Sequence, residues 1–70
     1  MSQPRQPQPL DIVVLNSAGQ SDLEVGDVGT VVELLPPEGL EVEFLDRDGR
    51  TRCIATLTTR DVLVLNCERN

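Results

Sequence analysis

Five short apolar runs, separated by glycine, proline and aspartate, constrain the fold of this chain more than any other feature. The second run covers residues 30–35 and follows Gly26 and Gly29, and the third, residues 40–45, alternates apolar and acidic residues. Alternation with a period of two is typical of a strand that buries one face, and a glycine at a strand marks a bend or a close backbone approach. The sequence therefore predicts short strands that curl around one core.

Turn residues separate these runs. Residues 36–39, Pro-Pro-Glu-Gly, predict one turn, and residues 46–49, Asp-Arg-Asp-Gly, predict a hairpin whose glycine takes the left-handed conformation. The simplest register across this hairpin sets Glu43 opposite Arg52. Such a pair of opposite charges would stabilise the sheet by up to about 1 kcal/mol.

The remaining runs complete the strand order. We expect a first strand at residues 11–16, buried on both faces, a fourth at residues 50–57 and a fifth at residues 62–65, with a single helical or 3₁₀ turn at residues 58–61. Five short strands close or curl, because a flat sheet of them would leave its edges exposed. The predicted fold is all-β, a small SH3-like five-stranded barrel with one 3₁₀ turn before the last strand.

Alternation also predicts which side chains are buried. Leu23 and Val25 are expected to pin the long loop at residues 17–27 to the core. The third and fourth strands are expected to turn these side chains inward: Leu40, Val42, Phe44, Thr51, Cys53, Ala55 and Leu57.

The length of 70 residues predicts a single domain. Residues 1–9 alternate proline and glutamine with one arginine, a composition that buries no apolar surface, so we expect a flexible, disordered N-terminal tail. The barrel domain is expected at residues 10–66, followed by a short C-terminal tail at residues 67–70.

The charge balance excludes some classes of partner. Acidic residues outnumber arginines by 12 to 6, lysine and histidine are absent, and the net charge is -6. This disfavours nucleic acid, because its phosphates bind clustered Lys and Arg. No apolar run approaches the roughly 20 residues that span a bilayer, and residues 1–9 lack the apolar core of a secretory signal. We therefore expect a cytoplasmic protein without a membrane partner.

The residue types also disfavour catalysis. Without histidine or lysine, the chain offers only hydroxyls, thiols and carboxylates as reactive groups. Acidic pairs such as Glu41 and Glu43 are expected to occupy alternate, solvent-facing positions of a strand and to have no catalytic role. We predict no enzyme activity, no metal and no cofactor. Cys53 and Cys67 lack the spacing of a metal or redox site and are expected to be reduced thiols, with a structural disulfide as the alternative.

Two segments carry a family resemblance. Gly26-Asp-x-Gly-Thr-Val-Val-Glu33 and Glu41-Val-Glu-Phe-x-Asp-x-x-Gly-Arg-Thr51 resemble the signature of a family of small bacterial domains of unknown function, over residues 10–65. Small acidic chains of this type resemble components found beside toxin-like or nuclease-like genes, which implies a neutralising partner. The first segment is also similar to KOW-type modules of ribosomal and transcription proteins and to SH3-like accessory subunits of metalloenzymes.

These observations favour binding over chemistry. We expect a non-enzymatic, acidic protein–protein interaction module that binds a basic protein, in the manner of an antitoxin or immunity protein. The alternative is an accessory or maturation subunit that docks on a larger enzyme, and KOW-like RNA binding is the third hypothesis. A homodimer through a barrel edge is a further expectation. The candidate partner-binding residues are Glu33, Glu41, Glu43 and Asp46, with a second group in the long loop formed by Asp22, Glu24 and Asp27.

Overall fold

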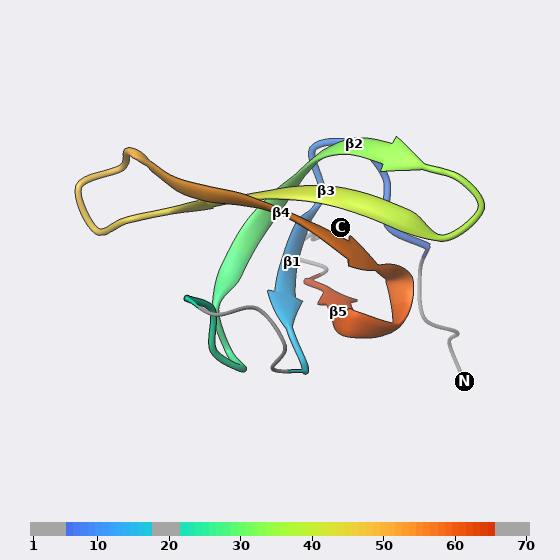
Figure 1. Cartoon of the computed structure of the whole chain (residues 1–70), viewed down its shortest axis with the longest axis horizontal. Coiled ribbons are helices and arrows are strands. Elements are labelled where there is room, and N and C mark those ends of the chain that lie inside the picture. Colours follow the sequence, from blue (N-terminus) through green and yellow to red (C-terminus); the bar gives the residue numbers. More distant parts are fainter. Residues whose placement is uncertain (1–5, 18–21, 66–70) are drawn as a thin grey trace, which may run out of the picture.

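The computed structural model describes residues 6–17 and 22–65 and shows one curled antiparallel sheet (Figure 1). Its elements are β1 Ile12–Leu15, β2 Val28–Leu35, β3 Gly39–Leu45, β4 Thr51–Thr58, the 3₁₀ helix η1 Thr59–Asp61, and β5 Val62–Val64. The strands are ordered β4-β3-β2-β1-β5 across the sheet. The prediction of an all-β fold with a single 3₁₀ turn before the last strand is confirmed.

The sheet curls without closing into a barrel. β4 and β5 stand at the two ends of the strand order, so they do not pair with each other. β2 connects the two halves because it pairs with β3 along its length and with β1 only near its start, where Ile12 faces Thr30. In Figure 1, β3 and β4 consequently lie above β1 and β5, and the core fills the space between them.

Two glycines shape the start of β2. Gly26 has a φ of +100°, which side-chain-bearing residues rarely adopt. Gly29 is needed for a different reason: a Cβ atom there would lie 2.6 Å from Cγ1 of Val42 and 2.9 Å from Cε2 of Phe44. The close backbone approach predicted from sequence is therefore present at Gly29, whereas Gly26 is required by its positive φ.

The core is a single cluster of apolar side chains: Val13, Leu15, Leu23, Val31, Leu40, Val42, Phe44, Ala55, Leu57 and Val62. Leu23 pins the long loop as predicted. The same prediction for Val25 is wrong, because its side chain is 62% exposed. The first strand is also buried on one face only: Val13 and Leu15 point inward, whereas Ile12 is 39% exposed, since nothing in the described chain covers the outer face of β1.

The β3–β4 hairpin differs from the expected register. Phe44 pairs with Cys53 and Glu43 with Ile54, and a shift follows between Phe44 and Leu45. The predicted pairing of Glu43 with Arg52 is therefore wrong. The irregularity inserts an extra residue into β4 and leaves Arg52 without a register partner in β3.

The turn chemistry accounts for this shift. The Asp46 carboxylate accepts hydrogen bonds from the backbone N–H groups of Asp48 at 2.8 Å and Arg50 at 3.0 Å. Gly49 has the predicted left-handed conformation, with a φ of +86°. The turn thereby closes between Asp46 and Arg50, and Thr51, expected in the core, is exposed.

The 3₁₀ helix is fixed by a capping box. The Thr58 N–H donates to Oδ2 of Asp61 at 2.9 Å, and the Arg60 N–H donates to Oγ1 of Thr58 at 3.3 Å. The Ser17 hydroxyl donates to Oδ1 of Asp61 at 2.8 Å. The hydrogen bond from the Thr58 backbone, followed by that from Ser17, lowers the pKa of Asp61 from its ordinary 3.8. An ionised Asp61 thus joins η1 to the end of β1.

The described part of the expected N-terminal tail lies against the sheet. Pro7 is buried, and the Gln8 N–H donates to Oδ2 of Asp11 at 2.9 Å. The Leu10 N–H then donates to the Val31 carbonyl at 2.8 Å. Residues 1–5 and the C-terminal tail at residues 67–70, including Cys67, lie outside the described residues.

Replacing Gly29 with Ala is expected to lower the free energy of unfolding by about 1–3 kcal/mol, because the new methyl group overlaps β3 side chains and its backbone. Gly49→Ala is the matched control, since its site has open space and its cost comes from positive φ alone, about 1 kcal/mol. Urea unfolding followed by circular dichroism measures both. An unchanged unfolding midpoint for Gly29→Ala would show that β2 is not packed this closely on β3.

Candidate functional site

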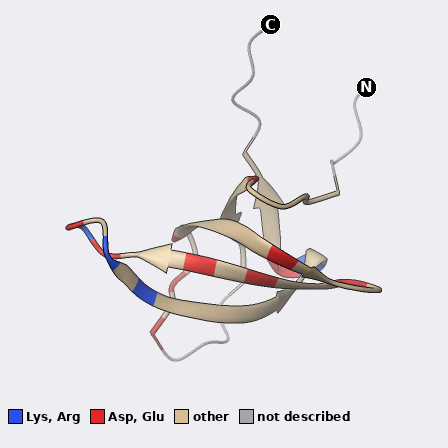
Figure 2. Ribbon diagram, turned by 90° about the horizontal axis from the view of Figure 1, so that it is seen from above, with Lys and Arg blue, Asp and Glu red and all other residues tan. Residues whose placement is uncertain are grey.

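Three of the seven candidate carboxylates lie together on the outer face of the sheet. Glu41 and Glu43 alternate with the buried side chains of β3, and a bulge between Val31 and Glu33 in β2 sets Glu33 directly opposite Glu41. Figure 2 looks onto this side and shows the acidic bands on β3 and the neighbouring strand. We call Glu33, Glu41 and Glu43 the glutamate face.

Neutral donors orient the two β3 carboxylates. Oγ1 of Thr56 donates to Oε2 of Glu41 at 3.3 Å, and Oγ1 of Thr51 donates to Oε2 of Glu43. Both threonines come from β4, so the hairpin positions the carboxylates while leaving their charges in place. Glu33 is exposed and has no hydrogen-bond or ion-pair partner among the described residues.

The glutamate face carries unrelieved repulsion. Like charges directly opposite each other in an antiparallel pair destabilise a sheet, and Glu33 and Glu41 stand in that relation. In the described part of the chain, the ion pairs lie elsewhere: Arg52 with Asp27 at 3.6 Å, and Arg60 with Glu38 at 3.3 Å. No described arginine therefore neutralises this face, and a cation from another molecule would meet three carboxylates.

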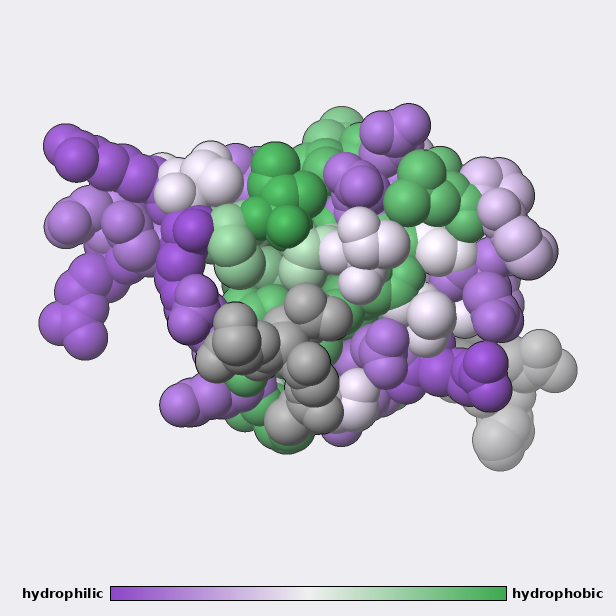
Figure 3. All heavy atoms as spheres, in the orientation of Figure 1, coloured by the Kyte–Doolittle hydropathy of each residue, from purple (hydrophilic) through white to green (hydrophobic). Residues whose placement is uncertain are grey.

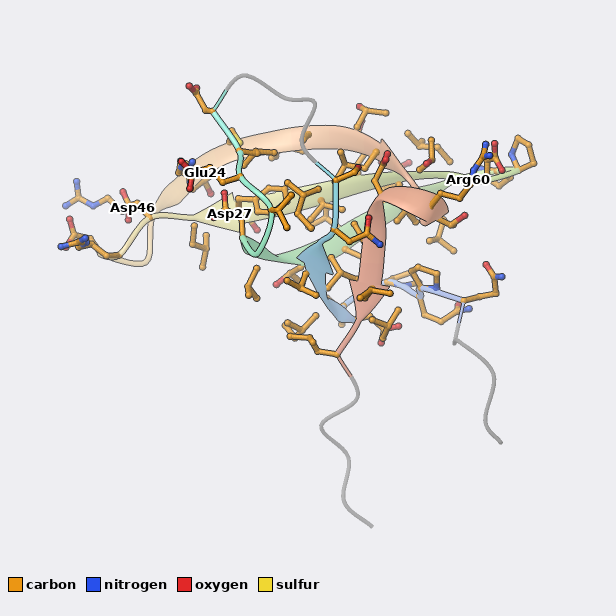
Figure 4. The ribbon with its side chains drawn as sticks, turned by 90° about the horizontal axis from the view of Figure 1, so that it is seen from below. Glu24, Asp27, Asp46 and Arg60 are labelled. Atoms are coloured by element: carbon orange, nitrogen blue, oxygen red, sulfur yellow. The ribbon has the colours of Figure 1, made fainter. Side chains whose placement is uncertain are left out.

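Asp46 has a structural role instead. Its carboxylate accepts the two backbone hydrogen bonds that shape the β3–β4 turn. Figure 4 places it where β3 leads into that turn. The structure therefore separates Asp46 from the glutamate face in function, because its charge is already committed to the turn.

The second predicted group lies on the loop, below the β3–β4 ribbon in Figure 1 and thus on the side opposite the glutamate face. Arg52 reaches this loop: its guanidinium donates to the Asp22 carbonyl and pairs with the Asp27 carboxylate. Asp27 also accepts the Glu24 N–H at 3.0 Å. The group is thus partly neutralised and organises the loop, and only Glu24 and Asp22 present side-chain charge freely.

An apolar outer surface on β1, β2 and β5 was not anticipated. Val14 pairs with Val28 on one side and Leu63 on the other, so these three side chains form a row across the sheet. Val28 and Leu63 are more than half exposed. In Figure 3, hydrophobic side chains lie over the middle of the molecule, and the β3–β4 hairpin end is hydrophilic. The signal was the unbroken apolar run at residues 12–15, which was interpreted as burial on both faces.

The unpaired side of β4 has no signal in the sequence, because it depends on how this strand is aligned with β3. Successive residues of an antiparallel strand turn their backbone N–H and C=O groups toward and away from the partner strand. The Thr59 N–H donates to the Glu38 carbonyl at 3.0 Å, which turns the backbone groups of Ile54 and Thr56 away from β3. No described residue bonds them. We call these groups of Ile54 and Thr56 the open edge.

The other features of the described residues that bear on chemistry are a free thiol and the absence of a metal-binding cluster. These residues contain no group of three or more His, Cys, Asp or Glu side chains placed to hold a metal ion. Cys53 is a free, partly buried thiol that packs against the core, which agrees with its expected inward orientation. Within the same residues, no helix has the length and apolar character to cross a membrane.

The Glu33→Gln substitution is expected to raise the free energy of unfolding by a few tenths of a kcal/mol, up to about 1, because it removes a like-charge pair. Salt screening should shrink the gain as ionic strength rises. Glu24→Gln changes net charge equally at an unpaired loop carboxylate and should have a smaller effect. Urea unfolding at low and high salt measures this, and a destabilised Glu33→Gln protein would contradict the repulsion.

Comparison with known proteins gives one match. Residues 10–64 match a family described as a domain of unknown function, DUF4926. No curated protein and no solved structure matches the chain. The match covers the whole described sheet, from two residues before β1 to the end of β5. The chain therefore belongs to the DUF4926 family of domains of unknown function.

Proposed function

We propose that this chain is a non-enzymatic protein–protein interaction module and that its glutamate face binds a basic protein. The observation that carries the proposal is the direct opposition of Glu33 and Glu41, beside Glu43, without a described cation on that face. A folded chain gains nothing from this arrangement, since it lowers stability. A cationic partner relieves the repulsion and is attracted from a distance by a chain of net charge -6.

The partner chemistry that fits best is a basic site built for phosphates. A row of carboxylates presents the same sign of charge as a nucleic-acid backbone, so it competes for the same Arg and Lys side chains. An antitoxin or immunity protein that occupies the basic site of a nuclease or other toxin would act in this way. The same charge disfavours the KOW-like RNA-binding hypothesis, because phosphates and the glutamate face repel each other.

The second candidate is an accessory or maturation subunit. The open edge favours it, since unpaired backbone groups at Ile54 and Thr56 offer a larger protein a strand to pair with. The identity of the partner separates the two hypotheses: a nuclease-like toxin supports the first and an enzyme subunit the second. A cytoplasmic location and an SH3-like relationship remain predictions in either case.

A triple variant tests the glutamate face. Glu33→Gln, Glu41→Gln and Glu43→Gln together remove three charges, and Glu24→Gln, Glu38→Gln and Asp48→Asn remove three from other exposed carboxylates. Partners are captured from an extract of the source organism at about 50 mM and about 500 mM salt, then identified and titrated as purified proteins. We expect a basic partner whose affinity falls at least about tenfold in the face variant and much less in the control.

Three results would refute this proposal. One is a purified partner that binds as tightly at high salt as at low salt, because an exposed charged interface is screened. Another is an equal loss of affinity in the two triple variants, which would show that binding depends on net charge and not on the glutamate face. The third is a partner whose binding is unchanged by the face variant.

A further inference from the structure

We infer that the open edge receives an extended segment of the basic partner as a sixth strand, whose arginine or lysine side chains recur at every second position. This inference rests on the proposed function and states how the partner is held. It joins two features of β4 and β3: the unpaired backbone groups of Ile54 and Thr56, and the carboxylates of Glu41 and Glu43 beside them.

The open edge is limited at both ends. Toward the hairpin, the register shift takes Arg52 out of the ladder, and its guanidinium turns to the loop. Toward η1, the Thr58 N–H is already donated to Asp61. Bulges and charges of this kind are what proteins use to block an edge strand, and here they leave Ile54 and Thr56 unblocked between them. The space suits a short strand of about five residues.

The register places this edge beside the glutamate face. Ile54 pairs with Glu43 and Thr56 pairs with Glu41, so each edge residue stands in a row with one carboxylate. Neighbouring strands lie about 4.8 Å apart, which puts an added strand about 10 Å from the β3 backbone. A long basic side chain on its outer face spans that distance toward a glutamate.

The alternation of a strand then sets the sequence pattern of the partner. Residues two apart share a face, so two basic residues at that spacing approach Glu41 and Glu43 together, whereas adjacent ones point to opposite faces. The Ile54 side chain is 55% exposed and would contact the aliphatic stem of one of them. The outer face at Thr56 carries only a small side chain and leaves room for the other.

Charge argues against a second copy of this chain at the edge. Two copies would each carry a net charge of -6 and repel one another. The arginine nearest the edge, Arg52, is already engaged by the Asp22 carbonyl and the Asp27 carboxylate. An extended segment of a basic protein is therefore the occupant that complements both the backbone and the charges.

Synthetic peptides test the inference directly. Thr-Thr-Arg-Val-Arg-Thr-Thr has its arginines two residues apart, and Thr-Thr-Val-Arg-Arg-Thr-Thr has the same composition with the arginines adjacent. Titration at about 50 mM salt should show the first peptide binding at least about tenfold more tightly. On binding, the amide protons of Ile54 and Thr56 should gain protection from solvent exchange, which is measured in the wild-type protein by NMR.

Protein variants distinguish the contribution of the open edge to peptide binding from that of the carboxylates. Ile54→Pro removes an outward N–H without touching the β3 ladder, a position where edge strands tolerate proline, and Ile54→Thr retains that N–H. We expect Ile54→Pro to abolish the preference for the alternating peptide and Ile54→Thr to keep it. If Ile54→Pro fails to fold, the amide protection in the wild-type protein decides alone.

The outcomes distinguish this inference from the proposed function. Equal binding of both peptides, weakened by Glu41→Gln and Glu43→Gln but without protection of Ile54 and Thr56, would refute strand addition and leave the acidic face standing. Absence of any binding of either peptide at low salt would refute strand addition alone, because the proposed function is tested by titration of the purified partner protein. A wild-type dimer in sedimentation that Ile54→Pro dissociates would refute the basic occupant, because a second copy would then fill the edge.

Discussion

Close packing of Gly29 on β3 is the constraint on which the rest of this structure depends. With no side chain at Gly29, the β2 backbone lies within reach of Val42 and Phe44, two of the most deeply buried side chains. The same strand then continues past a bulge and pairs with β3 along its far half. β2 can therefore pair with β1 in one half of the sheet and with β3 in the other, and one small apolar core fills the space between the two halves.

The register shift in the β3–β4 hairpin determines which carboxylates are neutralised by an arginine. The register expected from the sequence would have brought Arg52 opposite Glu43 and neutralised part of the outer face. The Asp46 turn instead shifts the register, and Arg52 turns to the loop, where it pairs with Asp27. The outer face keeps three carboxylates without a described cation, and the loop gains its organising contact. A single local feature thus stabilises one region and leaves the other available to a partner.

Local chemistry was predictable from sequence, and relations between distant segments were not. Gly49 in a left-handed turn, the single 3₁₀ turn before β5 and the inward alternation of Leu40, Val42 and Phe44 depend on neighbouring residues alone, and all are confirmed. The shift after Phe44 could not be predicted because alternative turn closures share the same sequence. Predicting that the two acidic groups lie on opposite sides of the sheet requires knowing the path of the loop. Predicting the exposure of Ile12 requires knowing that no described segment covers the outer face of β1.

The central claim is that β4 presents an unpaired edge beside the glutamate face, and amide hydrogen exchange in the free protein tests it most directly. Backbone alternation predicts slow exchange at Cys53, Ala55 and Leu57, which face β3, and fast exchange at Ile54 and Thr56, which face outward. Fast and slow amides should therefore alternate along the strand. Slow exchange at all five positions would mean that something already covers the edge, and it would contradict the account.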